Sequence, residues 1–142
     1  MIKYLTNFTS ECIITTEQET IHQLTNTSIM DSQNWRTNFF QELSQAEDAR
    51  NEGNEGKARV CARRAAAIVV GEYFARRGIT DLSQSTFDRL KYFSSLSDIA
   101  PQERKTCEHF LVRVLPDHNL PVEADLIADA RWLEKELLSK KA

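Results

Sequence analysis

Residues that interrupt helices are scarce in this chain. Its 142 residues include only four glycines and three prolines. Because glycine and proline break helices and mark turns, so few of them predict long helices joined by few connections. Hydrophobic residues make up 41% of the sequence and charged residues 27%, which suits one ordinary folded domain of this length.

Cysteine is also sparse, and its spacing argues against a metal site. Cys12, Cys61 and Cys107 lie far apart, without a CxxC pair and without a histidine at zinc-binding spacing. Glycine-rich phosphate loops and nucleophile elbows are missing as well, so we expect neither metal nor cofactor. The odd cysteine count indicates reduced thiols, with Cys61 and Cys107 as small core residues.

Long apolar runs are absent from the sequence. No run reaches the roughly 18 residues that a membrane span needs. The first residues, MIKYLTNFTSEC, lack the apolar core of a signal peptide. We therefore expect a cytoplasmic protein without a membrane partner, and the net charge of −3 gives no overall reason to expect nucleic acid.

The most informative stretch is KARVCARRAAAIVVGEYFARR, residues 57–77. Residues 65–71 are all small or apolar, and at 100° per residue they cover the whole circumference of a helix. A helix that is apolar all round is buried on all sides, so we expect a central buried helix that ends at Gly78. The stretch also carries six Lys or Arg against one acid, Glu72, so an anion site is expected here.

Apolar residues at helical spacing indicate four further helices, over residues 32–50, 86–96, 101–115 and 121–139. Ser85 followed by Asp88 resembles a capping box, and Pro101 suits the first position of a helix. Gly53 and Gly56 are expected in the turn between the first two helices.

These helices predict an all-α fold. Residues 31–142 would form a bundle of about five helices around the central one, and residues 1–30 a loosely ordered or docked tail. The expected core faces contain Trp35, Phe39, Phe40, Leu43, Ala46, Phe87, Leu90, either Phe93 or Tyr92, Leu96, Cys107, Phe110, Leu111, Val114, Val122, Leu126, Ala130, Leu133 and Leu137.

Residues 39–79, FFQELSQAEDARNEGNEGKARVCARRAAAIVVGEYFARRGI, resemble the first helical hairpin of the HEPN superfamily, the higher-eukaryote and prokaryote nucleotide-binding domains. In helix lengths and small residues the resemblance extends over roughly residues 34–138. It implies an up-and-down bundle of four or five helices, often a homodimer. Active members of the family are metal-independent ribonucleases, and others bind nucleotide or act as inactive scaffolds.

The resemblance also implies a catalytic pair. The family signature, an Arg followed after four to six residues by a His, fits Arg104 with His109, and Arg113 with His118 is a second match. The His would handle a proton of the ribose hydroxyl or leaving group, and the Arg would stabilise charge on the phosphorane. Lys105 and Phe110 depart from the residues usual beside this pair.

Helical geometry separates this pair. On a straight helix Arg104 and His109 point about 140° apart, so both reach one phosphate only if the helix end bends or a second subunit supplies half the site. The alternative is a surface pair of Arg104 with Glu108 and a half-buried His109.

A second set of candidates lies on the central helix. Arg59, Arg63 and Arg77 share one side of it and are expected to face phosphate or RNA. The alternative is an exposed edge that pairs with acids of the preceding helix, namely Glu47, Asp48 or Glu52. His118 likewise has an alternative role, in a rigid turn between two prolines.

Two classes of function follow, and the sequence leaves open whether the protein is an enzyme. The first is a HEPN-like protein that binds RNA or a nucleotide, or cleaves RNA without metal. The second is a non-catalytic helical module that dimerises or docks a protein partner, which predicts an exposed apolar patch. Family analogy adds a third, a companion of a nucleotidyltransferase.

Overall fold

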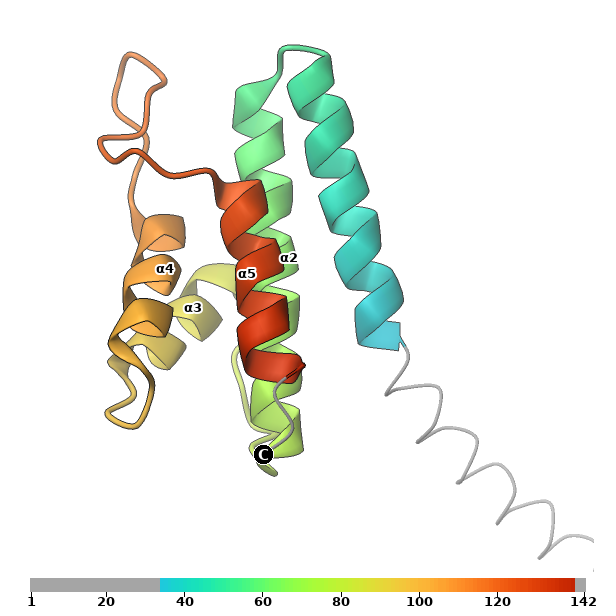
Figure 1. Ribbon diagram of the computed structural model, residues 1–142, viewed down its shortest axis with the longest axis vertical. Coiled ribbons are helices and arrows are strands. Elements are labelled where there is room, and N and C mark those ends of the chain that lie inside the picture. Colours follow the sequence, from blue (N-terminus) through green and yellow to red (C-terminus); the bar gives the residue numbers. More distant parts are fainter. Residues whose placement is uncertain (1–33, 140–142) are drawn as a thin grey trace, which may run out of the picture. The chain divides into compact units, whose positions relative to one another are not determined.

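A computed structural model describes residues 34–139 of the chain (Figure 1). Across this range the chain forms five helices and no strand, which confirms the all-α prediction. The predicted tail over residues 1–30 lies outside the described residues, as does Cys12. None of the helices between residues 34 and 139 is long and apolar enough to cross a membrane.

Within the described residues, the first helix covers residues 34–51 (cyan in Figure 1) and ends in a glycine turn. Gly53 has a φ of 80°, a conformation that favours glycine. The Asn54 amide donates to the Ala49 carbonyl (2.7 Å) and the Gly53 amide to the Arg50 carbonyl (3.0 Å). This is the Schellman pattern that ends helices, and it turns the chain into α2.

The second helix, α2, spans Glu55–Arg76. Asn54 caps it, because its side chain accepts a hydrogen bond from the Lys57 amide. Gly56 was expected in the connecting turn. It lies instead in the first turn of α2, because the Asn54 cap starts this helix at Glu55. The helix ends in a second glycine turn at Gly78, as predicted, with a φ of 77°.

The apolar stretch of α2 is largely buried. Of residues 65–71, all are buried except Ile68 and Gly71, which are partly exposed. The helix packs against α3 on one part of its surface and against α5 on another. The α2–α3 contact is close at Gly71, where an added Cβ would lie 3.2 Å from Arg89 Nη1.

The remaining helices are α3 (Thr86–Ser95), α4 (Pro101–Leu111) and α5 (Leu126–Leu138). As predicted, Ser85 caps α3 by accepting from the Asp88 amide. α4 starts with Pro101 at its first position. α3 packs on α4, and α4 also packs on α5.

α5 runs parallel to α2 (Figure 1). At the start of both helices, Arg50 contacts Glu55 of α2 and Asp125, the cap of α5. At the other end, Arg76 of α2 donates to the Leu138 carbonyl of α5 (3.0 Å). Arginines therefore join the two helices at both ends.

The connection between α4 and α5 is longer than predicted. α4 ends at Leu111 rather than residue 115, and α5 starts at Leu126 rather than residue 121. The Pro116 ring disfavours helical backbone at the preceding residue. Asp125 sets the later start, because its carboxylate caps the first turn of α5.

Most predicted core residues are buried, including Phe39, Leu43, Phe93, Phe110 and Leu133. Leu96, Leu111 and Leu137 are partly buried against the core. Four expected core residues are exposed, namely Phe40, Phe87, Val114 and Val122. The two valines lie in the long connection, where the helical spacing that assigned them does not apply. The two phenylalanines lie on helix faces that no other described element covers.

Candidate functional site

Arg104 and His109, the predicted catalytic pair, each have a partner on a different helix. Arg104 Nη2 donates to the Leu96 carbonyl at the end of α3 (2.6 Å). His109 Nδ1 lies 2.9 Å from Asp129 Oδ2 on α5, and since an ionised carboxylate only accepts, the ring N–H donates. Arg104 is therefore bound to the end of α3 and His109 to α5, and the two side chains are not bound to each other.

The alternative expected for this pair is met in part. The His109 side chain is half-buried, with 22% of its surface exposed. Glu108 forms no ion pair with Arg104 in the described part of the chain, because Arg104 turns toward α3. The Arg104 Nε atom is buried and has no hydrogen-bond partner among the described residues.

The candidate phosphate residues of α2 also point to protein groups. Arg59 Nη1 donates to the His118 carbonyl (2.8 Å) and lies 3.9 Å from Glu55 through Nε. Arg77 pairs with Asp98 (2.8 Å). The predicted pairing with acids of the first helix is wrong for both. The first turn of α2 and the α4–α5 connection supply nearer acceptors for Arg59, and the α3–α4 connection supplies one for Arg77.

Arg63 is the most deeply engaged of these arginines. Its Nε donates to the Phe110 carbonyl (2.9 Å) and its Nη2 to the Val112 carbonyl (3.1 Å), both at the end of α4. Burial, followed by the nearby charge of Arg59, lowers the pKa of the Arg63 guanidinium. The group stays a cation at neutral pH because free arginine titrates far above that range.

Arginines from other elements contact the C-terminal ends of three helices. Arg104 reaches the end of α3, Arg63 the end of α4 and Arg76 the end of α5. The last carbonyls of a helix lack partners within it and carry partial negative charge, so a guanidinium stabilises them. These contacts give three of the arginines a role in the fold that needs no nucleic-acid ligand.

His118, the weaker catalytic candidate, lies in an exposed tight turn. Its φ of 65° is left-handed, and its amide donates to the Leu115 carbonyl (2.9 Å). The Leu115 amide donates in turn to the Asn119 carbonyl (2.9 Å). The residue therefore shapes the turn between the two prolines, as the alternative role predicts.

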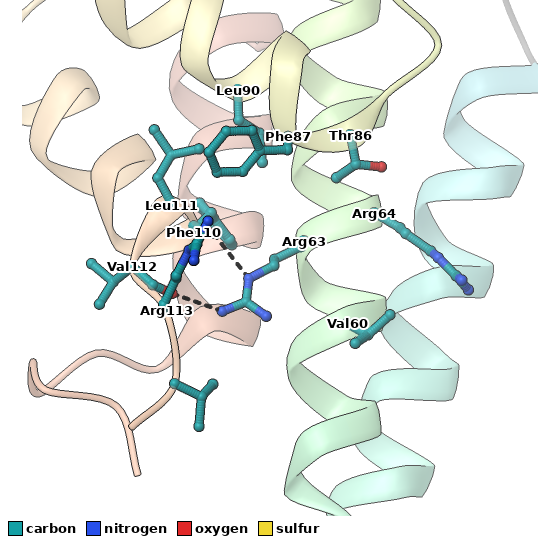
Figure 2. A pocket seen from close by; sticks show the side chains of 11 residues that line it. Val60, Arg63, Arg64, Thr86, Phe87, Leu90, Phe110, Leu111, Val112 and Arg113 are labelled. Carbon is teal, nitrogen blue, oxygen red and sulfur yellow. Dashed lines mark hydrogen bonds between the residues drawn. The ribbon is translucent and has the colours of Figure 1, made fainter. Parts of the chain in front are cut away.

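An open apolar groove lies between α2, α3 and the end of α4 (Figure 2). It has a volume of about 520 Å³. Eleven residues line it, namely Val60, Arg63, Arg64, Thr86, Phe87, Leu90, Phe110, Leu111, Val112, Arg113 and Val114. Seven of the eleven are apolar, so the groove offers a ligand mainly hydrophobic contact.

Three large apolar side chains are exposed together in this groove. Phe87 is 49% exposed, Val60 44% and Val114 38%, and they come from α3, α2 and the connection after α4. Leu90 and Phe110 are buried beneath them. Exposed apolar residues scattered singly are common, but a cluster in a concave surface indicates a binding site.

The charges around the groove all have one sign. Arg63, Arg64 and Arg113 line it, and none of the eleven residues is acidic. Figure 2 shows that Arg63 extends from α2 toward the end of α4, whereas Arg64 extends from α2 in the opposite direction. Arg64 and Arg113 are exposed. Neither forms a hydrogen bond or ion pair with another described residue.

A second hollow, of about 620 Å³, lies beside the start of α2. Glu52, Glu55, Arg59 and His118 line it together with turn residues. Because charges of both signs meet there, it matches no single class of ligand. In residues 34–139 no group of three His, Cys, Asp or Glu side chains could hold a metal ion.

The sequence did not predict this groove, although two of its lining residues belong to patterns that the sequence shows. The 3.6-residue period of α3 assigned Phe87 to the core, and Arg64 belonged to the basic stretch of α2. Periodicity identifies an apolar face but not whether another element covers it. No protein-family model, curated protein or solved structure matches the chain.

Proposed function

We propose that the chain is a non-catalytic helical docking module, and that its groove binds an apolar segment of another protein. The observation that carries this proposal is the joint exposure of Val60, Phe87 and Val114 in a concave, mainly apolar surface. A protein segment is favoured as occupant because three chain elements contribute to an open groove, which suits an elongated ligand.

Burial of Phe87 would contribute most of the binding free energy. Removing apolar surface from water stabilises a complex by about 25 cal/mol per Å², and an aromatic residue at the centre of an interface often carries much of the affinity. Leu90 and Phe110 are already buried below it, so the groove needs little rearrangement to accept a side chain.

The scaffold in this proposal is the bundle itself. We infer that α2 is its central helix, supported by the packing of α2 on both α3 and α5 and by the burial of Val69 and Val70. The up-and-down hairpin of the first helix and α2 is compatible with a HEPN-like inactive scaffold, and a homodimer through the groove would be one form of docking.

A displayed library of amphipathic helical peptides tests the proposal with the full chain as bait. We expect binders whose amide-shift changes map to the groove and whose affinity falls at least tenfold in Phe87→Ser. Phe40→Ser is the matched control, because Phe40 is 55% exposed and does not line the groove. Equal loss in both variants, or binders that map elsewhere, would contradict the docking function. Sedimentation of the protein alone would reveal self-association.

The second candidate function is RNA cleavage of the HEPN type, and one contact favours it. Asp129 orients His109, and a carboxylate that holds one ring nitrogen leaves the other free to accept a proton. Arg104 would have to leave the Leu96 carbonyl, or come from a second subunit, to share a phosphate with His109.

RNA cleavage is tested with a broad panel of RNA substrates in the absence of metal. If this function holds, His109→Ala abolishes cleavage while His118→Ala, in the exposed turn, retains it. Cleavage that survives in His109→Ala, or none by the unmodified protein, removes the candidate. Circular dichroism on both variants confirms that each is folded.

A further inference from the structure

We propose that the segment bound by the groove is an acidic amphipathic helix, with an apolar stripe bordered by Asp or Glu residues. This inference rests on the proposed docking function and names the chemistry of its partner. It follows from the charges around the apolar lining and from their positions.

The groove lining has a local excess of positive charge. The chain as a whole has a net charge of −3, yet the groove lining has three arginines and no acid. In a chain with 21 Asp and Glu residues, such a one-signed lining is a local departure from the average. A ligand of opposite charge would therefore be attracted, and a basic one repelled.

Two of these three arginines are available to a ligand. Arg63 already donates to the carbonyls of Phe110 and Val112, so it belongs to the scaffold. The other two, Arg64 and Arg113, are exposed and have no hydrogen bond or ion pair within residues 34–139. They are the two guanidinium groups that a ligand would meet.

The two available arginines lie on different elements of the fold. Arg64 belongs to α2 and Arg113 follows the end of α4, while Phe87 of α3 and Val60 lie in the same lining (Figure 2). The available cations thus come from two different elements that line the groove, Arg113 after the end of α4 and Arg64 on α2, where its side chain extends away from α4. An amphipathic helix with carboxylates on both borders of its apolar stripe matches these apolar and basic residues. Its successive turns place apolar side chains next to acidic ones, so the stripe could contact the apolar lining while the carboxylates pair with the arginines.

A nucleic acid fits the groove less well. Nucleic-acid interfaces are polar and strongly positive over a large area, whereas seven of the eleven lining residues here are apolar. Several arginines that could have extended a basic surface are instead engaged by protein groups, among them Arg59 and Arg77. The observations therefore favour an acidic protein segment over RNA.

Three synthetic helical peptides test the inference. They share one apolar stripe of Leu and Phe, and the positions that border it carry Glu, Gln or Lys. Fluorescence anisotropy with the full chain should rank the affinities Glu, then Gln, then Lys, with about a tenfold difference between the extremes at low salt. Because exposed charges are screened, the difference should shrink as salt is raised.

Charge reversal on the protein provides the decisive control. The double variant Arg64→Glu/Arg113→Glu should reverse the ranking, so that the Lys peptide binds best. Lys105→Glu is the matched variant, because Lys105 is an exposed cation of α4 outside the groove and its reversal should leave the ranking unchanged.

The failures of the two proposals are distinguishable. If all three peptides bind equally and Phe87→Ser weakens them all, the groove docks a partner but its preference for acids is wrong. If binding is independent of Phe87, the docking function itself is wrong. Absence of binding by every peptide, or a loss of RNA-oligonucleotide binding rather than peptide binding in the double variant, would overturn the acidic-helix inference.

Discussion

The Arg63 guanidinium of α2 donates to the carbonyl oxygen of Phe110 at the end of α4, with an Nε–O distance of 2.9 Å. A second bond from the same group reaches the Val112 carbonyl (3.1 Å). One planar side chain therefore binds the two carbonyls where α4 ends, and it does so from another helix. A residue that the sequence places in a phosphate strip is thus part of the packing between helices.

Replacing Arg63 should destabilise the protein. In Arg63→Met the two carbonyls lose their donors, and we expect a loss of about 1–3 kcal/mol in the free energy of unfolding. Arg63→Lys should recover only part of it, because an ammonium group does not reproduce the forked geometry. Urea titration followed by circular dichroism measures both.

Arg64 supplies the control for this prediction. It is the next residue, exposed and without a hydrogen bond to a described residue, so Arg64→Met should change the free energy of unfolding by less than about 0.5 kcal/mol. Similar losses in Arg63→Met and Arg64→Met would show that the Arg63 contacts contribute little to stability.

Two glycines, one inside α2 and one just after its end, should respond oppositely to alanine. Gly71 lies inside α2, where glycine costs about 0.5–1 kcal/mol relative to alanine. The added Cβ would lie 3.2 Å from Nη1 of Arg89, whose Nε and Nη2 donate to Ser83 and Gln84. We expect this side-chain end to shift by a few tenths of an ångström, so Gly71→Ala should stabilise the protein by up to that amount. Gly78→Ala should destabilise it by about 1 kcal/mol or more, because Gly78 has a φ of 77°.

The melting temperatures of the two alanine variants separate the effect of backbone conformation at Gly78 from the effect of steric contact with Arg89 at Gly71. Apart from the chain neighbours of Gly78, no atom of residues 34–139 lies within 4 Å of the added Cβ, so the cost of Gly78→Ala would be conformational. A lower melting temperature for Gly71→Ala would mean that Arg89 is held too firmly to move away from the α2–α3 contact.

Asp125 should make the stability depend on pH at the acid end. Partial burial raises the pKa of its carboxyl, but hydrogen bonds from Arg50 and from the Ala128 amide outweigh that effect and hold the pKa below the ordinary 3.8. A group whose pKa is lowered by folding stabilises the protein above its unfolded value, and this contribution is lost as pH falls through the folded value. We therefore expect Asp125→Asn to cost stability at pH 7 and progressively less below about pH 4.

The cap and the ion pair at Asp125 are separable. Asp125→Ala also removes the acceptor for the Ile127 and Ala128 amides and should cost about 1 kcal/mol at neutral pH. Because the Asp125 side chain is 53% exposed, solvent screens its attraction to Arg50, and high salt should reduce the effect of Asp125→Asn. A pH-independent cost for Asp125→Asn would contradict the role of the charge.

Cys107 should be nearly inert toward alkylation in the native protein. Burial raises the pKa of its thiol to about 12, and its Sγ donates to the Leu90 carbonyl at 3.2 Å. At pH 8 only about one molecule in ten thousand would carry the thiolate, which is the reactive form. Peptide mapping after iodoacetamide treatment should find Cys107 unmodified in native protein and modified in urea. Rapid native modification would mean that α4 opens readily.

The features that the sequence predicted correctly depend on neighbours within a few residues. Gly53 and Gly78 end helices because their missing Cβ permits a left-handed backbone, and Ser85 begins one because its oxygen reaches an amide three residues ahead. The apolar period likewise placed Phe93 and Leu133 in the core. Short-range sterics and hydrogen bonds decide all of these, and both can be read in order along the chain.

The candidate site was less predictable, because it depends on which element lies opposite each side chain. Phe87 has the spacing of a core residue, yet no described element covers it. Arg104 and His109 match a spacing in sequence, yet α3 and α5 supply their partners. The spacing of two residues along the chain does not show which groups of other helices will contact their side chains.

By itself, the sequence determined that the chain is helical, where most helices begin or end and which stretch of α2 is apolar all round. Only the tertiary structure decided that Arg63 binds the end of α4 and that α5 runs parallel to α2. It also decided that Arg64 and Arg113, beside an apolar groove, have no partner among residues 34–139. The physical reason is one of range. Helix formation is governed by contacts within about four residues, whereas the fate of a guanidinium or a phenyl ring is set by partners that approach only when helices pack.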